Sequence, residues 1–345
     1  MTSRFEGCRV VDYFAGLGGF TLGASRAGAT VVQAINHWPL AVEMHRRNHP
    51  SVAHACEDLT RFDPRRLPAF DVLTAGPACQ GHSLANGAAV GTEHYASWDA
   101  SRATAWSVID CAEVRRPRGI VVENVMRFVK WKLWDLWWQA LRALGYEVRV
   151  QCCDAQHYGA PQERPRVIMT AVHGREAPQV PGARAVYERS EVLTLGGRRE
   201  TVWRWRKLPL PRVRPVPIVE VIAWSEGEWS RIDRPGRSPA TLARVARGRA
   251  RFGARFVMPY NGSGSGLTGR SLARPLGTVT AADRWAVVDD DRMRMLTLSE
   301  LRAAMGFPDG YELPPVRKDA TEMVGNAIVP ALARRAVRAV MEAVS

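Results

Sequence analysis

The sequence predicts an α/β fold: a doubly wound, Rossmann-like sheet with a second, smaller domain. Short β-branched segments alternate with helical stretches over residues 8–172, the pattern of a mostly parallel sheet covered on both faces. After His173 the chain becomes rich in proline, arginine and aromatic residues with little helical period, and from about residue 288 the first pattern returns. We therefore predict a large domain at 1–172, a small domain at 173–287, and a segment at 288–345 that returns to the large domain.

The expected strands are short β-branched runs at residues 8–14, 30–36, 71–76, 119–125, 146–155 and 166–172. Amphipathic helices are expected near residues 20–27, 38–48, 103–115 and 131–144. The last of these helices carries tryptophans at helical spacing, which predict a core-facing stripe: Trp131, Trp134, Trp137 and Trp138. Near the C-terminus, Thr297 and Glu300 form a capping box, and a final helix is expected over 330–344.

Positive charge is concentrated in one part of the chain. The net charge is +14, and residues 175–273 hold 19 Lys/Arg against 8 Asp/Glu. A polyanion is the natural partner of such a segment. Only four of the 48 basic residues are lysine. A GC-rich genome is an alternative explanation for this preference for arginine, although it does not explain the clustering.

Composition excludes several classes of protein. A hydrophobic content of 46% with 12 Trp is incompatible with a disordered chain. There is no apolar run of about 18 residues and no signal-peptide pattern, so we expect a cytoplasmic protein without membrane contact. The six cysteines show neither a Cys-x-x-Cys spacing nor histidine partners at zinc-ligand intervals, so we expect reduced thiols and no metal site.

A glycine-rich turn, DYFAGLGGFTLG at residues 12–23, joins the first strand to the first helix. Its glycines at 16, 18 and 19 allow a ligand to approach the backbone, with the helix N-terminus behind it. Dinucleotides, nucleoside cofactors and plain tight turns all use such a loop. A nicotinamide dinucleotide would favour an acidic residue about 20 positions later, but the second strand ends at Asn36, which offers a ribose only an uncharged hydrogen bond. Asp58 is a further candidate for the cofactor pocket, with a helix cap as its alternative role.

Residues 71–87, DVLTAGPACQGHSLANG, place Cys79 just after a strand. A free cysteine is commonly a small buried hydrophobe, but a thiol at a strand end is also available as a nucleophile. Glu123 follows another apolar strand and should lie at the same edge of the sheet. Burial there would raise its pKa and suit it to general acid catalysis, with a salt bridge or a cap as the alternative. Arg164 and Arg166, two positions apart, indicate either a solvated or a substrate-clamping pair.

Taken in order, these motifs resemble those of the DNA cytosine-5 methyltransferases. The family's Phe-x-Gly-x-Gly-Gly, Pro-Cys, Glu-Asn-Val, Gln-x-Arg-x-Arg, Arg-Pro-x-x-Thr-Val and Gly-Asn motifs are matched by Phe14–Gly19, Gly76–Ser83, Glu123–Val125, Gln162–Arg166, Arg274–Val279 and Gly325–Pro330. The basic segment lies where the family has its target-recognition domain. The resemblance therefore implies a catalytic and cofactor-binding domain at 1–172, target recognition at 173–287, and a C-terminal segment at 288–345 that belongs with the catalytic domain.

The resemblance implies transfer of a methyl group from S-adenosyl-L-methionine to carbon 5 of a flipped-out cytosine in double-stranded DNA. Cys79 would add covalently to the ring, Glu123 would act on ring nitrogen 3, and Arg164 and Arg166 would favour the thiolate. The implied cofactor residues are Phe14, Ala15, Gly16, Gly18, Gly19, Asn36, Asp58, Pro77 and Asn326. A monomer is expected, and a cognate restriction endonuclease, where one exists, is not required for activity. Residues 84–102 are expected to form a loop that closes over DNA.

Three positions depart from the family pattern: Ala78 replaces a usual proline, His82 a usual phenylalanine and Asn36 a usual glutamate. These changes free the loop before Cys79, add a titratable group close to it, and remove a charge from the ribose contact. Three other functions are alternatives: RNA methylation by the same chemistry, DNA binding without catalysis, and a nicotinamide-dependent oxidoreductase. The last leaves the cysteine, the glutamate and the basic segment unexplained.

Overall fold

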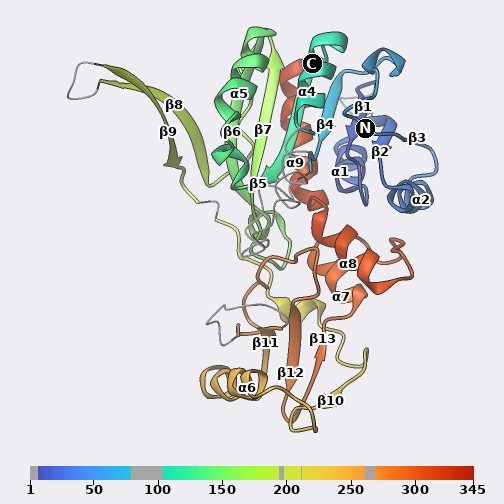
Figure 1. The fold of residues 1–345 in the computed structure, drawn as a ribbon, viewed down its shortest axis with the longest axis vertical. Coiled ribbons are helices and arrows are strands. Elements are labelled where there is room, and N and C mark those ends of the chain that lie inside the picture. The colour runs from blue at the N-terminus through green and yellow to red at the C-terminus, as the bar shows by residue number, and fades with distance from the viewer. Residues whose placement is uncertain (1–6, 79–103, 194–197, 211, 261–268) are drawn as a thin grey trace, which may run out of the picture. The chain divides into compact units, whose positions relative to one another are not determined.

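A computed structural model describes residues 7–78, 104–193, 198–210, 212–260 and 269–345 (Figure 1). Cys79, His82 and the expected loop at 84–102 lie outside these described residues. The chain divides into two compact units. Unit 1 comprises Met1–Asp154, Pro165–Arg212 and Pro330–Ser345, and unit 2 comprises Ala155–Arg164 and Val213–Val329.

Unit 1 is built on a nine-stranded sheet whose described strands follow the order β3-β2-β1-β4-β5-β7-β6-β8-β9. The strands from β3 to β5 are parallel, β7 runs antiparallel to both of its neighbours, and β8 and β9 form an antiparallel hairpin at the edge. The strand bounds are Arg9–Tyr13 (β1), Thr30–Asn36 (β2), Ala53–Cys56 (β3), Val72–Ala75 (β4), Gly119–Val125 (β5), Tyr146–Asp154 (β6), Pro165–His173 (β7), Ala185–Leu193 (β8) and Arg199–Lys207 (β9).

Helices cover both faces of this sheet, as a doubly wound fold requires. On one face, α9 packs closely on α1 and β5. A Cβ added to Gly23 would lie 2.6 Å from the Cβ of Ala333, and a Cβ added to Gly119 would collide with the side chain of Val340. On the other face, α4 and α5 share a buried core with alternate residues of β1. The bounds are Gly19–Ala27 (α1), Pro39–Asn48 (α2), Trp106–Arg115 (α4), Trp134–Ala143 (α5), Pro330–Val344 (α9), Pro64–Arg66 (η1) and Phe128–Lys130 (η3).

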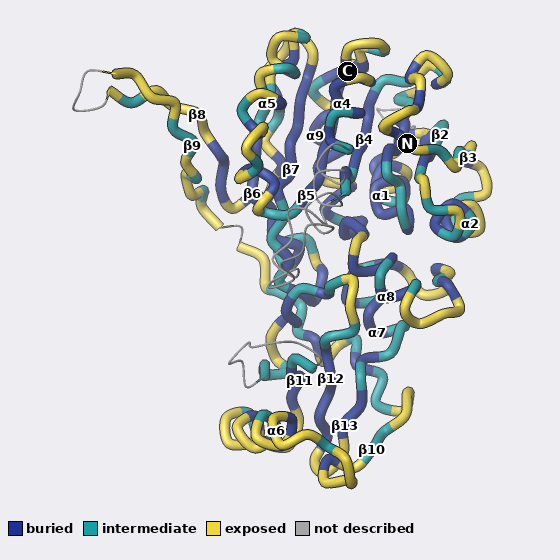
Figure 2. The backbone as a smooth tube through the Cα atoms, viewed as in Figure 1, coloured by how far each residue is buried: buried dark blue, intermediate teal, exposed yellow. Residues whose placement is uncertain are grey.

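Unit 2 contains a four-stranded antiparallel sheet in the order β10-β13-β12-β11 among its described residues. Strand β12 is buried along its whole length, whereas most of α6 is exposed (Figure 2). A core cluster of this unit is formed by buried residues of α6, of the strands and of the position directly after β10: Ile232, Val245, Phe256, Met258, Ala286, Val288 and Met293. The bounds are Ser230–Arg231 (β10), Arg255–Pro259 (β11), Trp285–Asp289 (β12), Arg292–Met295 (β13), Pro239–Phe252 (α6), Leu298–Ala304 (α7), Arg317–Asn326 (α8), Ala155–Tyr158 (η4) and Ile218–Val221 (η5).

Most of the expected elements are confirmed. The six expected strands, the four helices between them and the terminal helix all form, and Thr297 and Glu300 make the expected capping box. The tryptophan stripe faces the core, since Trp134 and Trp137 are buried and the other two tryptophans pack against the same cluster. The expectation of little helical structure after His173 is wrong for residues 239–252. Ser238 caps this helix, and its buried positions recur at helical spacing.

The compact units follow other boundaries than the predicted domains. The hairpin β8–β9 extends the large sheet through β6, and its Trp203 and Trp205 pack against the core of unit 1, so this unit continues to Arg212. Residues 288–329 belong to unit 2 and only α9 returns to unit 1, because α7 is tied to β13 by a buried ion pair. No helix in the described part of the chain is long and apolar enough to cross a bilayer.

Candidate active site

The carboxyl ends of β1, β4 and β5 meet at one edge of the large sheet. Glu123 lies one residue beyond the last pair that β5 forms with β4. The backbone N–H of Gly76, just after β4, donates to the Tyr13 carbonyl at the end of β1, 3.2 Å away. Buried Asn124 donates from Nδ2 to the Pro77 carbonyl, 3.1 Å away. The structure therefore brings together the glycine loop, the Gly-Pro segment and the Glu-Asn-Val segment, as the sequence predicts.

The glycine loop between β1 and α1 has a sharply turned backbone. Phe14, Gly16 and Gly18 have φ angles of 58°, 52° and 96°, a left-handed region that glycine adopts without strain and phenylalanine does not. The Ala15 N–H donates to the Ile35 carbonyl at 3.1 Å, which anchors the loop at the end of β2. Helix α1 then begins without a side-chain cap and without an acidic residue in its first turn. Such a helix N-terminus suits an anionic group, for example a carboxylate.

Asp12, two residues before this loop, is a fully buried carboxyl group that the sequence analysis misses. Its Oδ2 accepts from the Thr21 hydroxyl at 2.7 Å and its Oδ1 from the Thr74 hydroxyl at 2.9 Å, so it joins β1 to α1 and β4. Burial raises the pKa of Asp12 to about 7, although these hydrogen bonds act in the opposite direction. The Thr21 hydroxyl also lies 3.0 Å from Nε2 of buried His45, whose Nδ1 is 2.7 Å from Nε2 of His54. An acidic residue inside an apolar strand is the sequence signal for this network.

Two residues expected in the cofactor pocket, Asn36 and Asp58, make local turn contacts. Asn36 ends β2, and its Oδ1 accepts from the Trp38 backbone N–H at 2.9 Å, which shapes the turn into α2. Exposed Asp58 accepts from the N–H of Thr60 at 3.0 Å and from its hydroxyl at 2.8 Å, and these bonds hold the pKa of Asp58 below its usual value. Asp58 therefore caps a turn rather than a helix. The cofactor roles of both residues stay predictions.

Glu123 and Arg166 form a diagonal ion pair across the antiparallel strands β5 and β7. Arg166 Nε lies 3.0 Å from Glu123 Oε1, and the two side chains are 12% and 10% exposed. Arg166 also donates from Nη1 to the Pro165 carbonyl at 2.9 Å. A charge-assisted contact of this kind fixes the direction of the carboxyl group and stabilises its ionised form. The salt bridge foreseen as the alternative for Glu123 is present, while its role as an acid stays a prediction.

Cys79, the predicted nucleophile, lies outside the described residues, directly after Ala78 in sequence. The Ala78 backbone N–H donates to Thr104 Oγ1 at 3.1 Å, which holds the described end of this segment. Several other cysteines are poor candidates, because burial raises their pKa to about 11 for Cys8 and Cys152 and to about 12 for Cys111. These thiols stay protonated at neutral pH.

The other arginine of the Gln-x-Arg-x-Arg motif belongs to unit 2. Arg164 is 2% exposed and donates to three main-chain carbonyls of its own unit, those of Val279 (2.6 Å), Gly325 (2.7 Å) and Ala327 (2.8 Å). Two of these carbonyls flank Asn326, which is exposed. Both terminal nitrogens of the Arg164 guanidinium are thus held by main-chain carbonyls, and its predicted catalytic role stays a prediction. The predicted cofactor contact of Asn326 stays a prediction.

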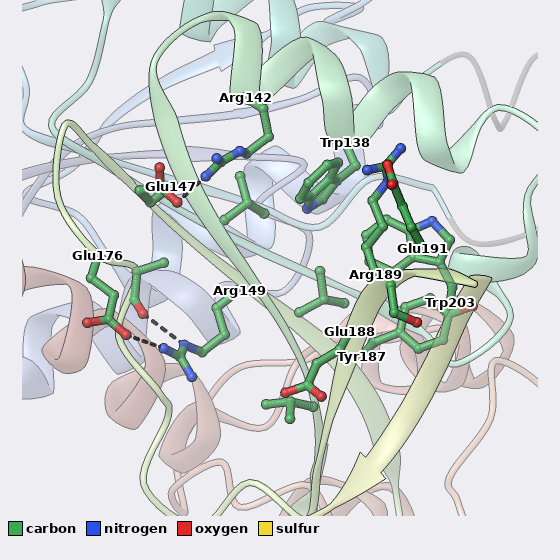
Figure 3. A pocket seen from close by; sticks show the side chains of 15 residues that line it. Trp138, Arg142, Glu147, Arg149, Glu176, Tyr187, Glu188, Arg189, Glu191 and Trp203 are labelled. Atoms are coloured by element: carbon green, nitrogen blue, oxygen red, sulfur yellow. Dashed lines mark hydrogen bonds and ion pairs between the residues drawn. The ribbon is translucent and has the colours of Figure 1, made fainter. Parts of the chain in front are cut away.

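A separate pocket of about 470 Å³ lies among α5, β6 and the hairpin β8–β9 in unit 1 (Figure 3). Trp138 and Trp203 contribute aromatic walls. The charged side chains around it are paired, as Arg142 is with Glu147 and as Arg149 is with Glu176. None of its lining residues is a site residue predicted from the sequence.

The sheet order, the glycine loop and the strand-end cluster define an α/β protein of the methyltransferase type. The solved structure of the Schizosaccharomyces pombe Dnmt2 methyltransferase has a TM-score of 0.64 at 15% identity, covering 97% of this chain and 98% of that chain. A prophage-encoded E. coli protein named as a DNA modification methyltransferase gives a TM-score of 0.67 at 17% identity, covering 98% and 99%. At these identities the likeness concerns the fold alone.

The model of the C-5 cytosine-specific DNA methylase family matches residues 8–197 and 237–342, so this chain belongs to that family. It is 29% identical over 170 residues to the type II methyltransferase M.HgiBI of Herpetosiphon aurantiacus, covering 48% of this chain and 37% of the relative. It is 28% identical over 170 residues to the type II methyltransferase M.HhaI of Haemophilus parahaemolyticus, covering 48% and 49%. These matches span about half or less of each relative's length.

Proposed function

We propose that this chain is a DNA cytosine-5 methyltransferase that moves a methyl group from S-adenosyl-L-methionine to carbon 5 of a flipped-out cytosine. The observation that carries the proposal is the cluster at the carboxyl edge of the sheet. There the Glu123–Arg166 pair and Asn124 lie beside the segment that ends at Ala78, the residue before Cys79. Membership of the C-5 cytosine-specific DNA methylase family supports the same reaction.

Cys79 is the proposed nucleophile. Carbon 5 of cytosine is unreactive within its aromatic ring, and addition of a thiolate to carbon 6 makes it enamine-like and nucleophilic. An ordinary thiol with a pKa of about 8.5 is only a few per cent ionised at pH 7, so a nearby cation helps. Arg166 is the proposed source of that charge. After the methyl group is on carbon 5, water takes the carbon 5 proton and the carbon–sulfur bond breaks. The nitrogen 3 proton returns to the departing sulfur, which restores the aromatic ring and the thiol.

Glu123 is proposed to act on ring nitrogen 3, where electron density builds as the thiolate adds. The proton that the thiol loses moves to nitrogen 3, and the carboxylate accepts a hydrogen bond from the N–H formed there. Arg166, 3.0 Å away, favours the ionised carboxylate and aims it. This role differs from the neutral general acid that burial alone would favour, because the structure gives Glu123 a cationic neighbour.

The glycine loop is proposed to bind S-adenosyl-L-methionine, which supplies the electrophilic methyl group when bound. The N-terminus of α1, without a side-chain cap or an acidic residue, suits the carboxylate of its amino-acid part. The polar ends of neighbouring strands suit its sugar and base. The proposed contact residues are Phe14, Ala15, Gly16, Gly18, Gly19, Asn36, Asp58, Pro77 and Asn326.

Duplex DNA is the proposed substrate. A cytosine inside the duplex can reach this edge of the sheet only by base flipping. The predicted target-recognition segment, residues 173–287, overlaps both units, and we assign target recognition mainly to the part within Val213–Val329. The protein is proposed to act as a monomer, without the need for a cognate endonuclease.

The proposed reaction is tested with DNA that carries 5-fluorocytosine at the target position. Fluorine cannot leave as the carbon 5 proton does, so the covalent adduct should persist on a denaturing gel. We expect no adduct from Cys79→Ala and a normal adduct from Cys8→Ala. The target sequence comes from mapping modified cytosines after expression in a host that lacks cytosine methylation. Methyl transfer from labelled cofactor to tRNA but not to DNA would overturn the DNA proposal.

A further inference from the structure

Helix α6 of unit 2, Pro239–Phe252, carries positive charge without any acidic residue. Its sequence, PATLARVARGRARF, contains four arginines and no aspartate or glutamate. The helix is well fixed, since Ser238 caps it and Val245 is buried in the core of the unit beside Phe256. The charges therefore lie on a rigid element rather than on a loose segment.

Three acidic residues of unit 2 are paired with arginines outside α6. Asp289 lies 2.6 Å from Arg255 and 2.8 Å from Arg292. Asp233 and Asp291 both pair with Arg231. No carboxylate among the described residues forms an ion pair with an arginine of α6.

Two arginines of α6 serve unit 2 itself. Arg244 donates to the Pro259 carbonyl at 2.8 Å, and Arg249 donates to the Asp290 carbonyl. Arg247 and Arg251 are exposed, and neither has an ion-pair partner within the described residues. They are four positions apart, so they are neighbours on one flank of the helix, where like charges repel. An anionic partner would relieve this repulsion.

The outward face beside these two arginines is lined by small side chains. Ala243, Ala246 and Ala250 are exposed at helical spacing, so another surface can approach the helix backbone closely. Favourable interaction of cations with a helix C-terminus accounts for Arg251, which lies in the last turn. It does not account for Arg247, which lies before that turn.

We propose that α6 is a backbone anchor for duplex DNA: Arg247 and Arg251 contact phosphates and read no bases. The inference rests on the proposed function only in its choice of partner. A row of arginines that is uncompensated by carboxylates matches the phosphate charge of DNA, which repeats every 3.4 Å or so along each strand. Because every sequence carries the same phosphates, this anchor adds affinity for all DNA and leaves the target sequence to other residues.

The test compares Arg247→Gln/Arg251→Gln with the full-length parent in equilibrium binding to target and non-target duplexes over a range of salt concentrations. We expect weaker binding to both duplexes by a similar factor. The slope of log affinity against log salt should become shallower by about 0.9 for each lost contact, or about 1.8 for the pair. The methylated sequence should stay the same.

The control is Arg334→Gln/Arg338→Gln. These two exposed arginines lie on α9 in unit 1 and are likewise four positions apart, although Arg338 pairs with Glu342. This variant should leave the slope unchanged. The anchor would be overturned by an unchanged slope in the α6 variant, by an equal change in the control, or by loss of binding to the target duplex alone. In a parallel measurement with an RNA duplex, loss of binding to RNA but not to DNA would overturn it too. Because binding is measured without methyl transfer, a protein that binds DNA through α6 but does not methylate it would refute the proposed reaction and leave the anchor standing.

Discussion

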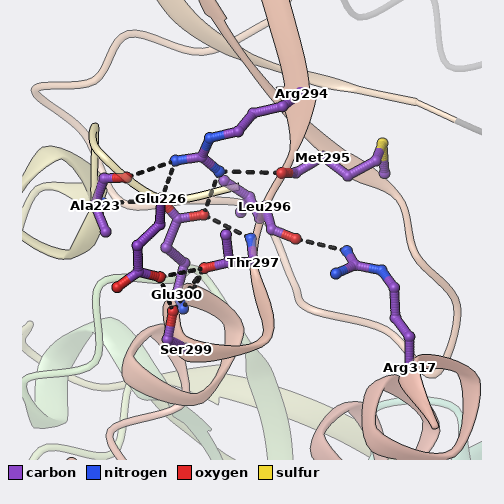
Figure 4. Close-up of polar contacts among 9 residues, drawn as sticks. All are labelled: Ala223, Glu226, Arg294, Met295, Leu296, Thr297, Ser299, Glu300 and Arg317. Carbon is purple, nitrogen blue, oxygen red and sulfur yellow. Dashed lines mark hydrogen bonds and ion pairs between the residues drawn. The ribbon is translucent and has the colours of Figure 1, made fainter. Parts of the chain in front are cut away.

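Two arginine–glutamate ion pairs, one from each unit, have the same chemical groups, and we expect them to have different roles. In unit 2, Arg294 and Glu300 lie 2.7 Å apart with side chains that are each 1% exposed (Figure 4). Glu300 also accepts from the backbone N–H groups of Thr297 and Ala223, and Arg294 donates to the carbonyls of Met295 and Ala223. In unit 1, Glu123 and Arg166 lie 3.0 Å apart with side chains that are 10% and 12% exposed, at the ends of their strands.

The difference lies in what surrounds each pair. Every oxygen of Glu300 receives hydrogen bonds from its own unit, so the pair is closed and ties α7 to β13. The Glu123 pair sits at the carboxyl edge of a mostly parallel sheet, the place where ligands of open α/β folds bind. We therefore expect the fully buried Glu300 pair to be structural and the Glu123 pair, at its strand end, to be functional.

The largest expected effect is the loss of catalysis in Glu123→Gln. The glutamine amide keeps the shape of the side chain, but its oxygen carries no negative charge to accept the hydrogen bond from protonated nitrogen 3. The rate of single-turnover methyl transfer should therefore fall by about 10²–10⁴-fold. Folding stability should fall by less than in Glu300→Gln, because Arg166 retains its bond to the Pro165 carbonyl and some contact with water. The measurements are quench-flow methyl transfer and urea denaturation.

Glu43→Gln is the control for this substitution, since Glu43 pairs with Arg46 and Arg47 on the exposed surface of α2 in the same unit. It should leave both rate and stability close to those of the parent. If Glu123→Gln instead loses as much stability as Glu300→Gln and keeps its rate, the two pairs do not differ in kind.

Glu300→Gln should mainly destabilise unit 2. It leaves the buried Arg294 guanidinium without its counter-charge, which typically costs about 3–5 kcal/mol. Hydrogen exchange of the full chain should quicken in α7 and β13 before it changes in β1, β4 or β5. The exposed Glu220→Gln is the control within the same unit and should leave exchange unchanged. Equal quickening in the large sheet would show that the effect is not local to the pair.

Local signals in the sequence were sufficient for six of the nine described strands of the large sheet, and they placed the predicted site segments at its carboxyl edge, whereas β3, β8 and β9 were not among the predicted strands. The β-branched runs and the glycine turn correctly predict β1, β4, β5 and α1, and parallel strands bring their carboxyl ends to one edge. Asp12 was not predictable in the same way, because its partner Thr74 is 62 positions away in sequence. Its burial depends on the pairing of β1 with β4.

Spacing could not separate the two arginines of the Gln-x-Arg-x-Arg motif. They are two positions apart, but Arg164 belongs to unit 2 and Arg166 to unit 1, since the chain passes between the units at Pro165. The distribution of charge along the sequence likewise did not predict which structural elements carry the arginines. The basic segment 175–273 is divided between an edge hairpin that pairs with β6 and the helix α6, and arginine content does not distinguish an edge strand from a helix.

Asn124→Ala should have an intermediate effect that sharpens the contrast at the strand ends. It removes the buried hydrogen bond to the Pro77 carbonyl and the acceptor for the Val125 N–H, at a cost of about 1–3 kcal/mol. Because the segment before Cys79 loses its tether, kcat should fall more than the affinity for DNA. Asn124→Asp keeps the acceptor but cannot donate to the carbonyl, so its kcat should fall as far. An aspartate variant with normal kcat would show that the tether has no catalytic role.

A pH dependence of folding stability is expected from His45, which contacts Thr21 beside buried Asp12, and from the neighbouring ring of His49. Burial lowers the pKa of His45 to about 2 and of His49 to about 4, whereas both titrate near their usual value of about 6.5 in the unfolded chain. Between about pH 4 and 6.5 the unfolded chain therefore binds more protons at these sites, and stability should rise with pH. Asp12 acts oppositely, since its raised pKa of about 7 makes the folded state the one that holds the proton in this window.

Two histidines against one carboxyl group leave a net rise of about 1.4 kcal/mol per pH unit from these three groups between about pH 4 and 6.5, which urea denaturation at several pH values would measure. His45→Gln should remove one titrating group and flatten the rise, whereas exposed His37→Gln should leave it as in the parent. Asp12→Asn should steepen it, because the opposing carboxyl group is gone. A pH dependence of stability that His45→Gln and Asp12→Asn leave unaltered would show that the buried network does not couple protonation to folding.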